Sequence, residues 1–388
     1  MLVNFSTVSF NSGYAPKKQV NFQGLSLIQT RGLYNKALRE GYAIPAFNFS
    51  NLENLEAIVK AAIAKRSPLI AQVSEGARKY AGEDVLIGMV NVFKKQAAKE
   101  NVPVMLHLDH GGDFDIAKKC VDAGFDSVMI DGSKYGFDEN VRLTKQVVDY
   151  AHAYKEGVFV EAELGKLAGV EDNVSSKTSL FTDPKEAAEF VKATGIDSLA
   201  ISIGTSHGPV KFRPDEKPEL DFKRLSQIKA AVEKILPANK GWTPNSRGWT
   251  QFPFVLHGAS SAPADLIAKI NSNVVIPRSK MEVLLAEVQG TIAKAKLQET
   301  MREIIAPHME KVTGKGVPEE MYSEAVKRGI AKVNVDTDFR LDYTATIKDL
   351  LANKPKTVDP RDYGKPVKAA LQGIGERKID MLGSANKA

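Results

Sequence analysis

The 388-residue sequence contains a single cysteine, Cys120, so an internal disulfide is excluded and a reducing compartment, the cytoplasm, is expected. No run reaches the roughly 18 consecutive apolar residues that predict a transmembrane helix. The net charge of +6 is spread along the chain without a long Lys/Arg run. That distribution argues against nucleic-acid binding and is compatible with small anionic ligands.

Acidic residues are absent from the first 38 positions, which raises the question of a transit peptide. The first 35 residues, however, carry only three basic residues, Lys17, Lys18 and Arg31, and have neither an Arg-rich amphipathic pattern nor a long apolar core. We therefore interpret residues 1–26 as an N-terminal extension that packs on or flanks a single domain over residues 27–388.

Eight short apolar runs alternate with segments of helical periodicity from about residue 44 onward. The runs are Ile44–Phe47, Leu69–Val73, Pro103–Leu106, Ser127–Ile130, Val158–Ala162, Ser198–Ile203, Phe252–Leu256 and Ala331–Val335. Helices are predicted between them, for example over Asn51–Lys65 and Pro184–Thr194. This alternation favours an α/β fold with a parallel sheet, and eight units favour a closed (β/α)8 TIM barrel over an open doubly wound sheet.

Two connections are longer than the others. Residues 237–251 are rich in Gly, Pro, Asn and Trp and are typical of a surface loop. Residues 262–329 join the seventh and eighth predicted strands and predict a helical insertion. Its segment Lys280–His308 is highly charged with helical spacing of apolar residues, which suits either a scaffold insertion or a subunit contact.

A polar residue able to bind a ligand, a metal or a proton follows every predicted strand. In chain order these are Asn48, Ser74, Asp109 with His110, Asp131, Glu163, His207, His257 and Asn334 with Asp336. The C-terminal ends of barrel strands meet around one pocket, so a full set at these ends predicts an active site.

His110, His207 and His257 come from three different strand ends, and each precedes a glycine. Three imidazoles with an open coordination position form a common catalytic zinc site, so we predict zinc there. His107 lies close to His110 in sequence and is expected to give a supporting hydrogen bond instead.

Four carboxylates accompany the histidines. Asp109 adjoins a predicted ligand and suits a general acid/base. Asp131 and Glu163 would orient the histidines or hold a second metal ion. Glu171 lies in the Gly-containing stretch Gly165–Asp172. It is either a base that swings in once substrate is bound or a solvated loop residue.

Small residues and basic companions form two groups that could bind phosphate. The first is Gly208, Gly258 and Ser260, with Lys211 close by in sequence. In the second, Asp336 and Thr337 open a predicted helix whose N–H groups would face an anion, and Arg340 follows them. Two such groups favour a doubly phosphorylated ligand.

In eight segments the chain resembles the class II, metal-dependent fructose-bisphosphate aldolases. These are Pro45–Asn48, His107–Gly111, Ser127–Asp131, Phe137–Val141, Val160–Gly165, Gly204–Gly208, Leu256–Gly258 and Val333–Asp336. The tail segments Asp359–Tyr363 and Gly383–Ala385 resemble it too. The order of the motifs makes the resemblance specific, and it extends from about Leu27 to the C-terminus.

This resemblance implies reversible cleavage of D-fructose 1,6-bisphosphate to dihydroxyacetone phosphate and D-glyceraldehyde 3-phosphate, through a zinc-stabilised enediolate, in glycolysis and gluconeogenesis. It implies zinc on His110, His207 and His257, and Asp109 as acid/base at the C4 hydroxyl. Glu171 would remove the carbon-bound proton of dihydroxyacetone phosphate. Asp131 and Glu163 would lie near an alternative metal position.

The resemblance also implies substrate-binding residues, a monovalent cation (Na⁺ or K⁺) at the first phosphate, and a homo-oligomer, either a dimer or a tetramer. The implied substrate-binding residues are Asn48, Ser74, Gly208, Lys211, Gly258, Ser260, Asn334, Asp336, Thr337 and, at the second phosphate, Arg340. Two departures are Ala168, where the family usually has glycine, and the long 262–329 connection, which puts the carried-over oligomer in doubt.

Three other functions compete with this hypothesis. The first is cleavage of tagatose 1,6-bisphosphate or another ketose bisphosphate. Tagatose 1,6-bisphosphate differs from the fructose compound in the configuration at one hydroxyl, which residue types do not reveal. A zinc hydrolase would use the histidines but would have no need of two phosphate sites and a separate loop acid. A non-catalytic binding protein would not need the complete set of histidines and carboxylates.

Overall fold

The computed structural model describes residues 25–166, 180–206, 208, 212, 216–236, 251–272 and 316–388, and the backbone of 169–171 and 174–176. Within these ranges eight parallel strands close into a barrel in the order β1-β10-β9-β8-β5-β4-β3-β2. They are β1 (Ile44–Asn48), β2 (Leu69–Ser74), β3 (Val104–Gly111), β4 (Ser127–Ile130), β5 (Phe159–Leu164), β8 (Ser198–Ile201), β9 (Phe254–Leu256) and β10 (Ile330–Val335). The predicted (β/α)8 barrel is confirmed, with one strand in each predicted run.

Strand β3 is longer than its apolar run and carries the His-Leu-Asp-His segment inside the sheet. Its pairing with β4 shifts register between Leu108 and Gly111, and His110 there has the left-handed φ of +49°. Gly111 is required next to it, because a Cβ would lie 2.6 Å from the carbonyl oxygen of Met129. This irregularity turns the strand end so that Asp109 and His110 both reach the barrel mouth.

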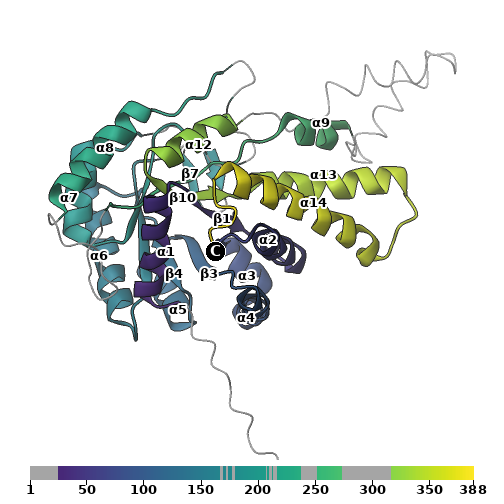
Figure 1. Ribbon diagram of the computed structural model, residues 1–388, viewed down its shortest axis with the longest axis horizontal. Coiled ribbons are helices and arrows are strands. Elements are labelled where there is room, and N and C mark those ends of the chain that lie inside the picture. Colours follow the sequence, from purple (N-terminus) through teal and green to yellow (C-terminus); the bar gives the residue numbers. More distant parts are fainter. Residues whose placement is uncertain are drawn as a thin grey trace, which may run out of the picture.

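Helices surround the barrel (Figure 1). Those between the strands are α2 (Leu52–Lys65), α3 (Glu75–Ala81), α4 (Glu83–Lys99), α5 (Phe114–Asp122), α6 (Phe137–Ala153), α7 (Pro184–Thr194) and α8 (Phe222–Ile235). Side-chain caps fix where several begin: Asp183 accepts hydrogen bonds from the N–H groups of Lys185 and Glu186, and Asn51 accepts one from Asn54. Between β5 and α7 a short antiparallel pair, β6 (Gly169–Glu171) and β7 (Val174–Ser176), follows the barrel strand.

An additional helix, α1 (Leu27–Glu40), closes the N-terminal end of the barrel. Tyr34 of α1 stacks on Phe159 with ring centroids 4.5 Å apart, and both pack with Ile70 and Met105 in one buried apolar cluster. The sequence did not reveal this role for α1. The cluster closes this end of the barrel with apolar side chains, and the predicted site residues lie at the other end.

Helices α9 (Ala264–Ser272) and α12 (Glu319–Lys327) lie at the two ends of the predicted 262–329 connection. Its middle, including Lys280–His308, lies outside the described residues, as do 1–24 and 237–250. After β10, α13 (Thr337–Asn353) and α14 (Pro360–Met381) run side by side away from the barrel (Figure 1). In the described part of the chain, no helix is long and apolar enough to span a bilayer.

Candidate active site

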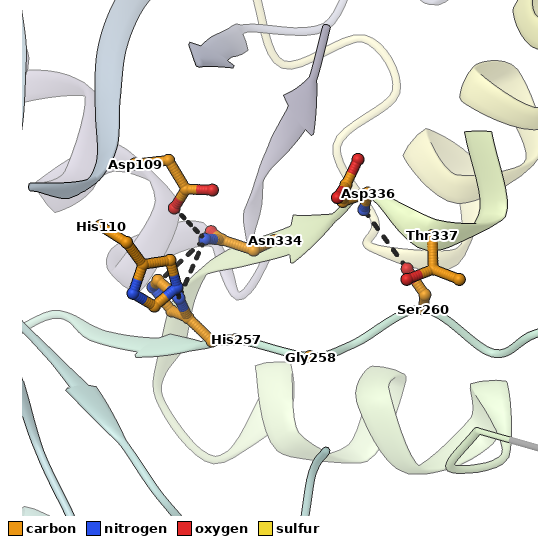
Figure 2. A pocket seen from close by; sticks show the side chains of 8 residues that line it. All are labelled: Asp109, His110, His257, Gly258, Ser260, Asn334, Asp336 and Thr337. Carbon is orange, nitrogen blue, oxygen red and sulfur yellow. Dashed lines mark hydrogen bonds between the residues drawn. The ribbon is translucent and has the colours of Figure 1, made fainter. Parts of the chain in front are cut away.

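A pocket lies where strands β3, β9 and β10 end, at the C-terminal face of the barrel (Figure 2). It is lined by Asp109, His110, His257, Gly258, Ser260, Asn334, Asp336 and Thr337. All eight are residues predicted from the sequence, either at the strand ends or in the two groups that could bind phosphate. The closed barrel therefore gathers residues that are more than two hundred positions apart in the chain.

Asp109 is buried and is held by three side-chain amides. Asn48 Nδ2 donates to Asp109 Oδ2 at 2.8 Å, and Gln72 Nε2 lies 3.3 Å from the same oxygen. Asn334 Nδ2 donates to the other oxygen at 3.2 Å. These donors are neutral, so they fix the carboxylate in place without pairing it with a cation.

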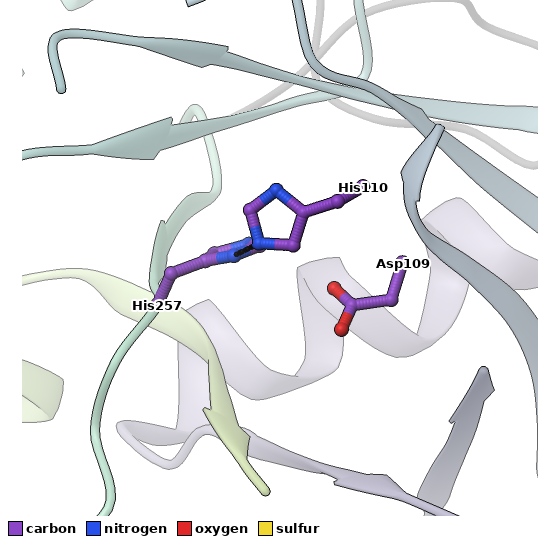
Figure 3. Close-up of side chains that lie close together, drawn as sticks. All are labelled: Asp109, His110 and His257. Atoms are coloured by element: carbon purple, nitrogen blue, oxygen red, sulfur yellow. Dashed lines mark hydrogen bonds between the residues drawn. The ribbon is translucent and has the colours of Figure 1, made fainter. Parts of the chain in front are cut away.

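His110 and His257 face each other beside Asp109 (Figure 3). His110 Nε2 lies 2.9 Å from His257 Nδ1, and the two rings are nearly perpendicular. The remaining nitrogen of each ring is held by a buried carboxylate: His110 Nδ1 by Asp131 at 2.9 Å, and His257 Nε2 by Glu161 at 2.8 Å. Such carboxylate–imidazole pairs orient histidines whose free nitrogen binds a metal.

The charges at the site are strongly coupled. Burial lowers the pKa of an imidazole, but the carboxylates of Asp109, Asp131 and Glu163 outweigh it and hold the pKa of His110 well above its ordinary value. Burial and the positive charge of His110 hold the pKa of His257 well below. Burial and the charge of Asp131 raise the pKa of Glu163 well above its usual range. The opposite directions of these shifts reflect the packing of two imidazoles among three buried carboxylates.

Two overlapping groups could hold a metal ion. Asp109, His110 and His257 form one, and His110, Asp131 and Glu163 form the other, with the ligand atoms of each within 4.8 Å of one another. Both groups consist of residues predicted from the sequence. The class of ligand they suit is a divalent cation with mixed nitrogen and oxygen ligands.

The far side of the pocket is built from the loop after β9 and the start of α13. Ser260 Oγ accepts from the N–H groups of Asp336 at 3.3 Å and Asp338 at 3.4 Å. Gly258 has a φ of +63°, and a Cβ there would lie 2.5 Å from the carbonyl oxygen of Ser206. Arg340 forms an ion pair with Asp336 at 2.8 Å and has a half-exposed side chain. Backbone packing and a helix N-terminus meet here, as in anion-binding sites.

The other predicted site residues fall into two groups. Asn48, Asp131 and Glu163 are buried around the pocket, and Ser74 is buried where its Oγ caps α3 by accepting from Ala77. The second group lies outside the described residues or has no described side chain, and it consists of His207, Lys211 and the side chain of Glu171. Gly208 is described and has a φ of +78°.

Three buried polar residues of the site were missed: Gln72, Glu161 and Lys332. Each lies two residues before a residue that was predicted, namely Ser74, Glu163 and Asn334. Side chains two apart in a strand point to the same face. Polar residues at this spacing inside apolar runs are the signal that would have revealed the layer beneath the site.

His107 belongs to this lower layer. Its Nδ1 lies 2.8 Å from Ser127 Oγ, and its Nε2 lies 3.1 Å from Lys332 Nζ. Burial and the charge of Lys332 hold the pKa of His107 well below its ordinary value. Both ring nitrogens are engaged by polar partners, in agreement with the hydrogen-bonding role expected for this residue.

A closed parallel barrel that carries histidines and carboxylates at the C-terminal ends of its strands is typical of a TIM-barrel enzyme with a metal-binding active site. The chain matches the family described as "Fructose-bisphosphate aldolase class-II" over residues 28–313 and 297–387, and it belongs to that family. It is accordingly an enzyme, a carbon–carbon lyase of the aldehyde-lyase class.

Similar proteins cover almost the whole chain. A fructose-bisphosphate aldolase from Treponema pallidum (strain Nichols) is 40% identical over 381 residues, which are 95% of this chain and 99% of that protein. A protein of the same name from Thermus caldophilus is 38% identical over 358 residues, covering 92% and 98%. The crystal structure of the YdjI aldolase from Escherichia coli K12 is 27% identical, with a TM-score of 0.62 and coverage of 92% and 98%.

Proposed function

We propose that the enzyme reversibly cleaves D-fructose 1,6-bisphosphate to dihydroxyacetone phosphate and D-glyceraldehyde 3-phosphate, as a step of glycolysis and gluconeogenesis. The observation that carries the proposal is the cluster of Asp109, His110, His257 and Asn334 at the barrel mouth. The names of full-length relatives at about 40% identity support the choice of substrate.

A metal ion fits this cluster on two counts. Two Zn–N bonds of about 2.0–2.1 Å at a tetrahedral angle place nitrogens about 3.4 Å apart. The nitrogens of His110 and His257, which lie 2.9 Å apart, need to separate by only about 0.5 Å to reach that spacing. The surrounding carboxylates also attract positive charge, which a divalent cation supplies. We assign zinc to His110, His257 and His207, the last on the sequence alone.

When bound, zinc supplies Lewis-acid polarisation of the substrate ketone. Asp109 moves the proton to or from the aldol hydroxyl at C4, and its three amide donors keep it aimed at the pocket. Glu171, whose backbone lies in β6, takes the carbon-bound proton in the condensation direction. Asp131 and Glu163 form, with His110, the alternative metal position.

Phosphate binding is assigned to the far side of the pocket. Gly208, Gly258, Ser260, Asp336, Thr337 and Lys211 bind the first phosphate, together with a monovalent cation, Na⁺ or K⁺. Arg340 reaches the second phosphate, for which it must leave its ion pair with Asp336. Asn48, Ser74 and Asn334 contact the sugar chain, so both three-carbon halves are positioned for the reaction.

The test is triose phosphate release from fructose and tagatose 1,6-bisphosphates, before and after removal of metal with a chelator. We expect release from the fructose compound that is lost with the metal and restored by zinc. Activity that survives chelation, or borohydride trapping of a substrate imine, would contradict the metal mechanism. Preference for tagatose 1,6-bisphosphate would move the assignment to that substrate, and ester hydrolysis without aldol cleavage would favour a zinc hydrolase.

Three broader expectations remain proposals. Residues 1–26 form an extension of one catalytic domain over 27–388, with 262–329 as a helical insertion. The enzyme is a homo-oligomer, dimer or tetramer, to be measured by light scattering. It acts in the cytoplasm, as the lone buried Cys120 favours, and cell fractionation would check this.

A further inference from the structure

A buried ion pair lies one layer below the candidate metal site, inside the barrel. Lys332 of β10 donates to both carboxylate oxygens of Glu161 of β5, at 3.0 and 2.8 Å, and both side chains are fully buried. Glu161 Oε1 also accepts from His257 Nε2 at 2.8 Å. Lys332 contacts His107 at 3.1 Å. The pair therefore joins one predicted metal ligand to the histidine that was predicted to support the site.

The hydrogen bonds of the pair determine where the hydrogens of both imidazoles reside. A lysine ammonium only donates, so His107 Nε2 accepts from Lys332 and His107 Nδ1–H donates to Ser127 Oγ. An ionised carboxylate only accepts, so His257 carries its hydrogen on Nε2, which faces Glu161. The lone pair of His257 Nδ1 is then directed toward His110. Asn334 Nδ2 lies 3.3 Å from Nδ1 and 3.1 Å from Nε2, so it does not select between the two tautomers.

The lysine is needed because a buried carboxylate alone is costly. Lys332 balances the charge of Glu161 by contacting both of its oxygens, and Ser198 Oγ adds a contact at 3.4 Å. Glu161 therefore keeps an acceptor oxygen for His257 while its charge is balanced from within the barrel. His107 cannot replace His257 as a ligand, because its Nε2 is occupied by the lysine.

We propose that Glu161 and Lys332 are positioning residues that hold His257 in the orientation and tautomer that bind the metal. This inference rests on the proposed function, in which His257 is a metal ligand. Loss of the pair would let the ring rotate or carry its hydrogen on the wrong nitrogen. Metal affinity would fall even though no ligand is altered.

The test compares two buried lysines. Lys332→Met removes the cation beneath the site. Lys94→Met removes the cation paired with Asp126 at 2.6 Å, a pair that is also buried but lies at the opposite end of the barrel. Zinc affinity is measured without substrate, by equilibrium competition of the metal-free full chain with a chromogenic chelator. We expect Lys332→Met to bind zinc about 10–100-fold more weakly. Lys94→Met should stay within about twofold of the unaltered chain while its melting temperature falls.

Two further measurements test the inference if Lys332→Met does not fold. Glu161→Gln retains the size of the side chain but can present an amide N–H to His257, so it should also weaken zinc binding. Long-range ¹H–¹⁵N NMR of the metal-free chain should place the hydrogen of His257 on Nε2, and on either nitrogen in Glu161→Gln. A purely structural pair would leave both readouts unchanged.

The outcomes separate this inference from the proposed function. If the unaltered chain binds no zinc, both are wrong. If the unaltered chain binds zinc and the altered Lys332 and Glu161 chains bind it equally well, only the inference is overturned. A parallel loss of zinc affinity in Lys94→Met would also overturn it, since general destabilisation would then explain the effect.

Discussion

The two ends of the barrel both contain buried carboxylates and cations, but the carboxylate oxygens are fully hydrogen-bonded at only one of them. At the N-terminal end, Asp126 accepts from Lys94 Nζ and the Leu106 N–H, both at 2.6 Å. Asp197 accepts from Arg31, from His152 and from the Val160 N–H. Each of these carboxylates forms an ion pair with a buried basic side chain and accepts a hydrogen bond from a backbone N–H group. Through Arg31, the Asp197 contacts hold α1 against the barrel strands.

At the C-terminal end, some buried polar atoms of the site lack a hydrogen-bond partner. Asn334 Oδ1 and Glu163 Oε2 have no hydrogen-bond partner among the described residues. The pKa values of neighbouring groups there are displaced in opposite directions, upward for His110 and downward for His257. Burial of charged residues therefore does not distinguish a functional site from a structural ion pair. A buried carboxylate oxygen without a partner does, because a ligand can supply the missing partner.

Of the substitutions that test this difference between the two ends, Asp109→Ala at the C-terminal end should have the largest effect. Removal of the acid/base should lower kcat by about 10²–10⁴-fold. Zinc content should be retained, because the histidines carry the ligand nitrogens. Steady-state kinetics and metal analysis on the same preparation check this, and loss of zinc would instead make Asp109 a ligand.

At the opposite end, Asp126→Ala should destabilise the fold. It leaves Lys94 buried without its partner, which costs about 3–5 kcal/mol of unfolding free energy. The kcat of the molecules that remain folded should not change. Chemical denaturation and active-site titration give the two numbers. A drop in kcat per folded molecule would show that the two ends are functionally coupled.

Acid should weaken the N-terminal cluster through Asp197. Burial opposes its ionisation, but the hydrogen bond and charge of His152 and the charge of Arg31 hold the pKa of Asp197 below its ordinary value. The unfolded chain then binds the extra proton first, near an aspartate pKa of about 3.9, so stability is lost as the pH falls through and below that value. The melting temperature of Asp197→Asn should depend less on pH between about 5 and 3 than that of the unaltered chain. An equal dependence would contradict this cause.

The smallest effect is expected from two glycines with similar left-handed backbones. Gly258→Ala adds strain of about 1–2 kcal/mol and pushes a methyl against Ser206 in the proposed phosphate loop, so KM should rise. Gly41, with a φ of +68° and no atom within 4 Å of an added Cβ, is the matched control. Gly41→Ala should show the strain without the change in KM, and equal kinetics for the two variants would remove Gly258 from the substrate site.

The sequence predicted the barrel well because its strands are buried on both sides and form continuous apolar runs. It predicted the pocket because strand ends converge. Glu161 and Lys332 were missed, although each lies two residues before a predicted site residue and so on the same face of its strand. That they pair with each other depends on the closed barrel, which brings β5 and β10 within reach. Nor did the sequence predict that α1 closes the barrel, which depends on the contact of Tyr34 with Phe159, residues far apart in the chain. The roles of His207, Lys211 and Glu171 still rest on the sequence and the family.

The pairing of β1 with β10, in which Ile44 lies opposite Lys332, has a consequence for how the enzyme is made. At about 5–20 residues per second, a ribosome adds the intervening chain in roughly 15–60 s. Until β10 has been made, the sheet cannot close, and Asn334 is missing from the pocket that contains Asp109. A truncated chain that ends before β10 has neither a closed sheet nor a complete pocket. Quality control that removes chains with open sheet edges would therefore also remove those that lack a working site.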